Sequence, residues 1–269
     1  MDGVKPRLPS VRRFDGVSLN SPPLLRCLAG LGVAEVAAST LSLAERWSLW
    51  LAWTDAIRLS AVLGSGAPAA PASARPDAHA VAADCQRVRQ DLSQAIVTNT
   101  TFRAGLANAT PLPADSSPLD DSGRAHLQRL YQAQQGAMDE RIAPMRARVQ
   151  AALSRQSGDL ARLAALDAVL DEALAARQRR LLATVPGWLD RHFKRAPTTA
   201  PAAAAELQRL LLAELDLRLQ PVEAMTAALA QAAGRHASNP VADRATHPAT
   251  LPATRAATHP ARNLARPPA

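Results

Sequence analysis

Apolar residues recur at helical spacing through the middle of the chain. From residue 127 to residue 153 one stripe repeats at steps of three or four: Leu127, Tyr131, Gln134, Met138, Ile142, Met145, Val149 and Leu153. Such steps place side chains on one face of an α-helix. Because similar spacing continues to about residue 193 without a catalytic motif, the pattern predicts long amphipathic helices.

Capping signals and breaks divide the chain into successive predicted helices. They begin near residues 24, 43, 77, 123, 160, 186 and 202, and the first six end near residues 31, 63, 99, 155, 184 and 193. Ser42 and Glu45 form a capping box before the second helix, and Asp77 caps the third. Pro144 and Pro221 lie inside later helices, where we expect a kink at the first and a kink or break at the second.

Two further stripes predict which residues face the core. The third helix is expected to bury one series: Val81, Cys85, Val88, Leu92, Ala95 and Asn99. The fifth helix is expected to turn leucines to one side: Leu160, Leu163, Leu166, Leu170, Leu174 and Leu181.

Composition supports helices and excludes most sheet folds. Aromatic residues make up 3% of the 269 residues, and there are 12 glycines. A β-sandwich or a doubly wound sheet needs strand formers and turn glycines. We therefore expect an all-α fold, an elongated helical bundle of long amphipathic helices with disordered termini.

Changes in composition along the chain suggest its domain organisation. We expect residues 1–22 to form a flexible basic arm and residues 23–63 a Trp-rich helical unit. Residues 64–76 are rich in Ala and Pro and are predicted to be a linker. Residues 77–235 form the predicted main helical bundle, and 236–269 a disordered basic tail.

The net charge of +8 is concentrated at the two ends. Residues 1–26 carry five Lys and Arg against two Asp, and residues 236–269 carry four Arg against one Asp. The 22 Lys and Arg between them face 20 Asp and Glu. A nearly balanced middle is typical of a solvated surface of mixed sign, so the folded part is not expected to bind nucleic acid.

The cysteines and the apolar segments bear on location. Cys27 and Cys85 belong to no metal-binding spacing and are interpreted as buried free thiols, although a disulfide between them stays open. Arg12 and Arg13 precede an apolar run, as in a twin-arginine export signal, but Arg26 interrupts that run. The most apolar segment, 43–63, contains four charged residues, so we expect no transmembrane segment and a cytoplasmic protein.

Three tryptophans gather in the second predicted helix. Trp47, Trp50 and Trp53 lie within seven residues. Tryptophan is enriched where proteins bind each other, so these residues are candidates for a partner-binding anchor. The alternative is that they build the core of a small helical unit.

Four further residues in the later helices are candidates because they break the apolar pattern or can serve an interface. Gln134 and Met138 lie in the long stripe, where Gln134 either sets the helix register or marks a loose spot in the core. Asp167 and Arg177 fall on or near the leucine face of the fifth helix, where they either need buried partners or mark its rim.

Other ionisable residues show no catalytic or metal-binding arrangement. Glu214 and Arg218, four residues apart, are interpreted as an ordinary surface pair. No His follows a Glu at the spacing of carboxylate metal sites in helical bundles, and no nucleophile or phosphate-binding motif is present. We therefore expect no enzyme activity, no metal and no cofactor.

Several separated blocks carry a family resemblance. They include 131–149, 160–170, 181–186, 211–223 and the earlier segment 50–56. In this order they resemble the uncharacterised proteobacterial family known as domain of unknown function 3348. The resemblance implies no catalytic residue. Relatives in this family have genes near those of envelope-associated proteins. The resemblance therefore implies an accessory role beside a cell-envelope assembly.

These observations favour one function over another. The favoured hypothesis is a non-enzymatic helical adaptor or scaffold that associates with itself or with another protein through apolar helix faces. The alternative is a nucleic-acid-associated protein that uses its basic ends, and a weaker option is attachment of those ends to anionic lipid.

Overall fold

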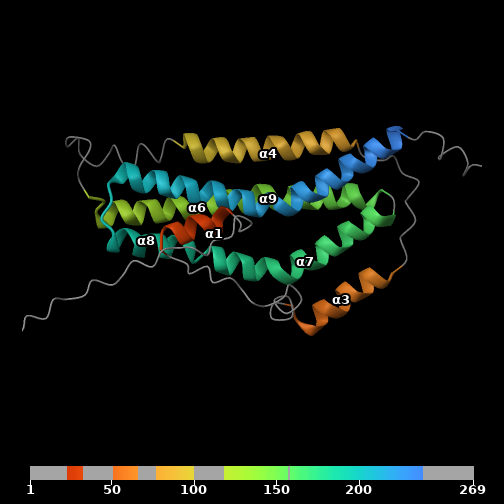
Figure 1. Ribbon diagram of the computed structural model, residues 1–269, viewed down its shortest axis with the longest axis horizontal. Helices are drawn as coiled ribbons and strands as arrows, with labels where there is room; N and C mark the ends of the chain where they lie inside the picture. Colours follow the sequence, from red (N-terminus) through yellow and green to blue (C-terminus); the bar gives the residue numbers. More distant parts are fainter. Residues whose placement is uncertain (1–22, 33–50, 66–76, 100–117, 157, 239–269) are drawn as a thin grey trace, which may run out of the picture.

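The computed structural model describes residues 23–32, 51–65, 77–99, 118–156 and 158–238 (Figure 1). In these ranges the chain is helical apart from short turns, connections and one isolated bridge between Pro118 and Thr199. The predicted all-α fold is confirmed for this part of the chain. The predicted disordered arm 1–22 and most of the predicted tail 236–269 lie outside the described residues, although the last helix continues to Ser238.

Most helices begin within about two residues of the predicted starts, but the prediction of one continuous helix over 43–63 is wrong, because residues 51 and 52 are not helical and α3 begins at Trp53. Their bounds are α1 Pro23–Gly30, α3 Trp53–Gly64, α4 Ala78–Thr98, α6 Asp121–Ser154, α7 Gly158–Leu182, α8 Val185–Arg195 and α9 Ala200–Ser238. The carboxylate of Asp77 accepts a hydrogen bond from the backbone N–H of His79 (2.9 Å), and that of Asp120 accepts one from Gly123 (2.7 Å). These caps satisfy amide groups that have no partner inside the helix. The predicted capping box at Ser42 and Glu45 lies outside the described residues.

Neither internal proline ends its helix. α6 continues through Pro144, and α9 continues through Pro221. Figure 1 shows α9 changing direction part way along its length. A break at Pro221 is therefore excluded.

α9 is the central helix of the bundle. It lies against α4, α6, α1 and α7, and α6 lies against α9, α7, α4 and α8. Figure 1 shows α4, α6 and α9 running along the long axis of an elongated molecule, with α3 beyond α7 at its edge. The early helices thus pack on the later ones, α1 on α9 and α3 on α7.

The long stripe of α6 is the best-predicted part of the core. All eight of its residues, from Leu127 to Leu153, are buried. In α4 the predicted residues Cys85, Val88 and Leu92 are buried and Val81 is half-buried, but Ala95 is exposed and Ile96 is buried in its place. Burial of the larger Ile96 side chain removes more apolar surface from water than burial of Ala95 would.

The predicted leucine face of α7 is wrong. Of its six leucines only Leu160 is buried, and Leu181 is 54% exposed whereas Leu182 is 6% exposed. The other buried residues of α7 are Ala161, Ala164 and Val169. Since α7 lies between α6 and α3, the face that meets the core is rotated away from the leucines, which are mostly half-buried.

Both cysteines have free thiols. Cys27 on α1 is half-buried, and Cys85 on α4 is buried. The Cys85 Sγ lies 3.4 Å from the Sδ of Met145 and 3.3 Å from the Oγ1 of Thr226, so it joins α4 to α6 and α9. None of the helices in the described ranges combines the length and the apolar character needed to cross a bilayer.

Candidate functional site

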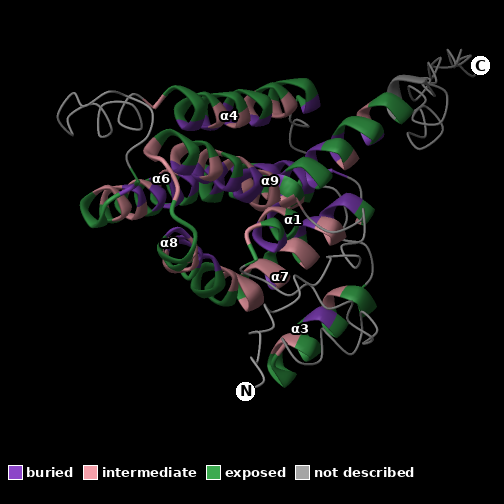
Figure 2. Cartoon of the chain, turned by 60° about the vertical axis from the view of Figure 1, so that its left-hand side comes forward, coloured by how far each residue is buried: buried purple, intermediate pink, exposed green. Residues whose placement is uncertain are grey.

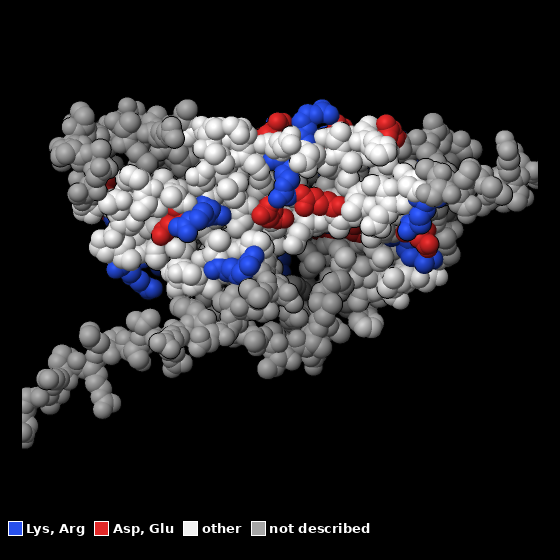
Figure 3. All heavy atoms as spheres, turned by 45° about the horizontal axis from the view of Figure 1, so that its top comes forward, with Lys and Arg blue, Asp and Glu red and all other residues white. Residues whose placement is uncertain are grey.

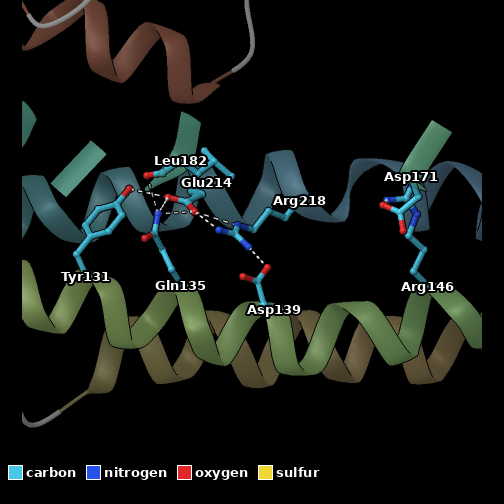
Figure 4. Close-up of polar contacts among 8 residues, drawn as sticks. All are labelled: Tyr131, Gln135, Asp139, Arg146, Asp171, Leu182, Glu214 and Arg218. Carbon is cyan, nitrogen blue, oxygen red and sulfur yellow. Dashed lines mark hydrogen bonds and ion pairs between the residues drawn. The ribbon is translucent and has the colours of Figure 1, made fainter. Parts of the chain in front are cut away.

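The most distinctive polar feature is a buried carboxylate between α6 and α9. The Glu214 side chain is 0% exposed, and three side chains donate hydrogen bonds to it (Figure 4). The Tyr131 hydroxyl donates at 2.8 Å, and the Gln135 amide lies 3.0 and 3.1 Å from the two carboxylate oxygens. Arg218 donates through Nε at 2.9 Å and through Nη2 at 2.6 Å.

Helical spacing places these groups together. Tyr131, Gln135 and Asp139 follow at steps of four on α6, and Glu214 and Arg218 are four apart on α9. Asp139 forms an ion pair with Arg218, and the Gln135 amide also donates to the backbone oxygen of Leu182 (3.0 Å). Since the last carbonyls of a helix lack partners within it, this bond attaches the end of α7 to the network.

The charges in this network are compensated. An isolated buried carboxylate is strongly destabilising, but here the Arg218 guanidinium, 8% exposed, lies against it. Burial raises the pKa of Tyr131 far above its usual range, and the negative charge and hydrogen bond of Glu214 raise it further. Tyr131 therefore stays a neutral donor, and the network serves to hold α6, α7 and α9 in register.

The interpretation of Glu214 and Arg218 as an ordinary surface pair is wrong. Sequence spacing correctly predicted that the two residues touch, but it missed that both are buried and that Tyr131 and Gln135 complete the site. A signal was present, because Glu214 interrupts an almost continuous apolar run from 210 to 215. A charge inside such a run requires partners on a facing helix.

A second cluster joins α6 to α7. Arg146 donates to the Asp167 carboxylate through Nε (2.8 Å) and Nη2 (2.7 Å), and it also pairs with Asp171. Gln150 donates to the same Asp167 carboxylate at 2.7 Å. Burial works to lower the pKa of Arg146, but the hydrogen bonds and charges of Asp167 and Asp171 outweigh burial and raise it.

Asp167 thus has the buried partners that its position required. Its side chain is 11% exposed, and the partners come from α6 rather than from α7 itself. Arg177, the other candidate on α7, is exposed. A cavity of about 110 Å³ lies between the two arginine clusters and has room for only a few water molecules.

The remaining candidates do not meet at one site. Trp47 and Trp50 lie outside the described residues, and Trp53 begins α3 with 80% of its surface exposed. Met138 and Gln134 are buried within the bundle, so neither belongs to the surface of this chain. The glutamine that carries the buried hydrogen bonds is the neighbouring Gln135.

α3 has an unusually exposed surface for a helix of this bundle (Figure 2). Leu59 is its one buried residue, while Trp53, Ile57 and Leu63 are all more than half exposed. Trp53 and Ile57 are four residues apart and share one face.

Two polar contacts also attach α3 to α7. Arg58 pairs with Glu172 at 2.5 Å, and Arg162 donates to the Ser65 backbone oxygen at 3.0 Å. The hydrogen bond and charge of Glu172 raise the pKa of Arg58, and the same contact lowers the pKa of Glu172.

Several charged side chains elsewhere form pairs of opposite sign. Arg89 on α4 binds Asp216 and Glu223 on α9, and Arg141 on α6 binds Asp91 on α4 at 2.8 Å. Figure 3 shows basic and acidic side chains interspersed over this face rather than gathered into one basic patch. Within the described ranges, no three His, Cys, Asp or Glu side chains come together in a way that could hold a metal ion.

Comparison with known proteins identifies a family and nothing beyond it. Residues 13–206 match the family model described as protein of unknown function (DUF3348). The match ends in the first turns of α9, so the resembling blocks beyond residue 206 and the residues Glu214 and Arg218 lie outside it. No curated protein and no solved structure matches the chain.

Proposed function

This chain belongs to the family of proteins of unknown function DUF3348, and we propose that it is a non-enzymatic helical adaptor that binds other protein chains. The observation that carries the proposal is the exposed apolar surface of α3, where Trp53 and Ile57 share one face and Leu63 is exposed near the end of the helix. Scattered apolar residues are normal on a surface, but a largely exposed tryptophan beside other large apolar residues is typical of a binding site.

The rest of the bundle supports the role of a rigid scaffold. Arginine–carboxylate contacts join α6 to α9, α6 to α7, α4 to α9 and α4 to α6. α3 by contrast is attached by one buried leucine and two polar contacts. A firmly packed body that carries one apolar helix at its edge suits a protein whose task is to hold a partner.

The test combines oligomeric state and partner capture. Light scattering after size exclusion measures self-association of the full chain, and affinity capture from the native host followed by mass spectrometry measures binding to other proteins. Replacing Trp53 and Ile57 together by Ala should abolish the association. The matched control is Val97→Ala on α4. Val97 is an apolar residue on another part of the bundle, and its exposed fraction is similar to that of Ile57.

Two outcomes would contradict the proposal. One is a strict monomer that retains no protein. The other is a partner that binds the Trp53/Ile57 double variant and the Val97 variant equally well, since α3 would then not be the binding surface.

A cytoplasmic location belongs to the same proposal. It is supported by the two free thiols, which are typical of a reducing compartment. An accessory role beside a cell-envelope assembly rests on the family resemblance alone. Labelling the thiols in intact cells with membrane-impermeant and permeant reagents would test the location.

The alternative function is binding of nucleic acid by the basic ends, supported by the excess positive charge of residues 1–26 and 236–269. Contacts with phosphate make affinity fall steeply with salt. Deletion of 236–269 together with neutralisation of Arg7, Arg12 and Arg13 should then remove DNA binding. Unchanged affinity would exclude this alternative.

A further inference from the structure

A groove between α1 and α9 contains two arginines that form no ion pair with the Asp and Glu side chains of the described residues. Arg26 comes from α1 and Arg209 from α9, and both line a groove of about 500 Å³. Both are exposed, and neither lies within ion-pair distance of an Asp or Glu in the described part of the chain. This contrasts with the arginines at the other helix contacts, such as Arg146 and Arg218, which bind carboxylates of a facing helix.

Packing of α1 places Arg26 in this position. Leu24, Leu28 and Ala29 are buried, and α1 rests on α9. Arg26 lies outside this buried face, is exposed, and lines the groove. Two like charges from facing helices repel each other, so an anion between them would stabilise the arrangement.

One carboxylate, that of Glu206, also lines the groove. Its buried Oε2 lies 3.6 Å from the Nε2 of His192 on α8 and has no hydrogen-bond partner in the described residues. Among the described residues Glu206 forms no ion pair with either arginine. The remaining walls include apolar or small residues, among them Leu31, Leu210 and the half-buried Cys27.

We propose that this groove binds a phosphate monoester that carries an apolar chain. One guanidinium fork saturates a carboxylate with two hydrogen bonds, whereas a phosphate has enough oxygens and charge to accept from two arginines at once. The groove volume lies within the range of small-molecule sites, and its apolar wall suits a hydrocarbon substituent. The phosphate can belong to a soluble ester or to the headgroup of an anionic lipid.

Cys27 provides a direct measurement of occupancy. It lines the groove, whereas Cys85 is buried in the core and serves as an internal control. Octyl phosphate is expected to slow alkylation of Cys27 by N-ethylmaleimide in the full-length protein and to leave Cys85 unchanged, as followed by mass spectrometry. Inorganic phosphate and octanoate are expected to protect far less, because each lacks one half of the ligand.

Matched variants test the role of the arginines. R26Q and R209Q should each weaken octyl phosphate binding by about tenfold or more in calorimetry, because each removes a charged hydrogen-bond fork. R129Q is the control, since Arg129 is an exposed arginine of α6 that does not line the groove. Sedimentation with phosphatidic acid vesicles, compared with phosphatidylcholine vesicles, distinguishes a lipid headgroup from a soluble ester.

Four results would overturn the proposal. The first is that octyl phosphate does not protect Cys27 and the protein does not bind phosphatidic acid vesicles. The second is that R129Q loses as much binding as R26Q and R209Q, and the third is that R26Q and R209Q bind octyl phosphate as well as the unchanged protein does. The fourth is that octanoate binds as tightly as octyl phosphate.

Discussion

The hydroxyl of Tyr131 on α6 donates a 2.8 Å hydrogen bond to the fully buried carboxylate of Glu214 on α9. The two residues are 83 positions apart, so the bond joins the two longest helices in the described part of the chain. Burial of a carboxylate is tolerated only where donors surround it. The stability of the bundle should therefore be sensitive to each donor.

Tyr131→Phe removes one donor to Glu214 and leaves the ring in place. We expect the free energy of unfolding to fall by about 1 to 3 kcal/mol, the range for a lost hydrogen bond to a buried charged group. Urea denaturation followed by circular dichroism measures this change. Gln132→Ala, at an exposed position one residue further along α6, should have almost no effect and serves as the control.

Arg218→Met removes the charge that compensates Glu214. A loss of about 3 to 5 kcal/mol is expected, because the carboxylate is left buried without its cation. The double variant Glu214→Gln with Arg218→Met should regain part of this loss, since no buried charge remains. Strict additivity of the two single changes in a double-mutant cycle would show that the pair is not coupled.

Acid should loosen the attachment of α3. Because Arg58 lowers the pKa of Glu172 in the folded protein, the contact stabilises docking at neutral pH. That contribution is lost as the pH falls through the lowered pKa of Glu172, where the carboxylate becomes protonated. Hydrogen exchange of the α3 amides should then rise relative to those of α6.

Glu172→Gln removes the ionisable carboxylate, so hydrogen exchange of the α3 amides should already be raised at neutral pH. It should then no longer rise further, relative to α6, as the pH falls. Glu140→Gln, which neutralises an exposed carboxylate of α6, is the matched control and should keep the acid-induced rise. An acid-induced rise in α3 exchange that persists in Glu172→Gln would assign the effect to another group.

Truncation of the two leucines at the end of α7 should change stability by very different amounts. Leu182→Ala is expected to cost about 2 to 5 kcal/mol, because this side chain is buried and its loss leaves a cavity. Leu181→Ala should change stability by no more than about 0.5 kcal/mol, as is usual for exposed positions. Thermal or urea unfolding of the two variants compares them directly, and equal effects would contradict the face assigned to α7.

Local sequence determined the helices of this protein and much of its core. The stripe from Leu127 to Leu153 is buried as predicted, because three- and four-residue spacing alone decides which side chains share a helix face. The N-cap Asp77 and the start of α8 near Pro186 were also readable, since capping depends on neighbours within a few residues.

Only the tertiary structure decided which face α7 turns to its neighbours and which charges were buried. The leucines of α7 looked like its core face, yet α7 buries Leu182 instead of Leu181 because both α6 and α3 pack on it. Glu214 and Arg218 looked like a surface pair, but Tyr131 and Gln135 approach them from a helix about eighty positions away. Periodicity is a local property, whereas burial and polar partners depend on long-range packing between helices, which local spacing does not encode.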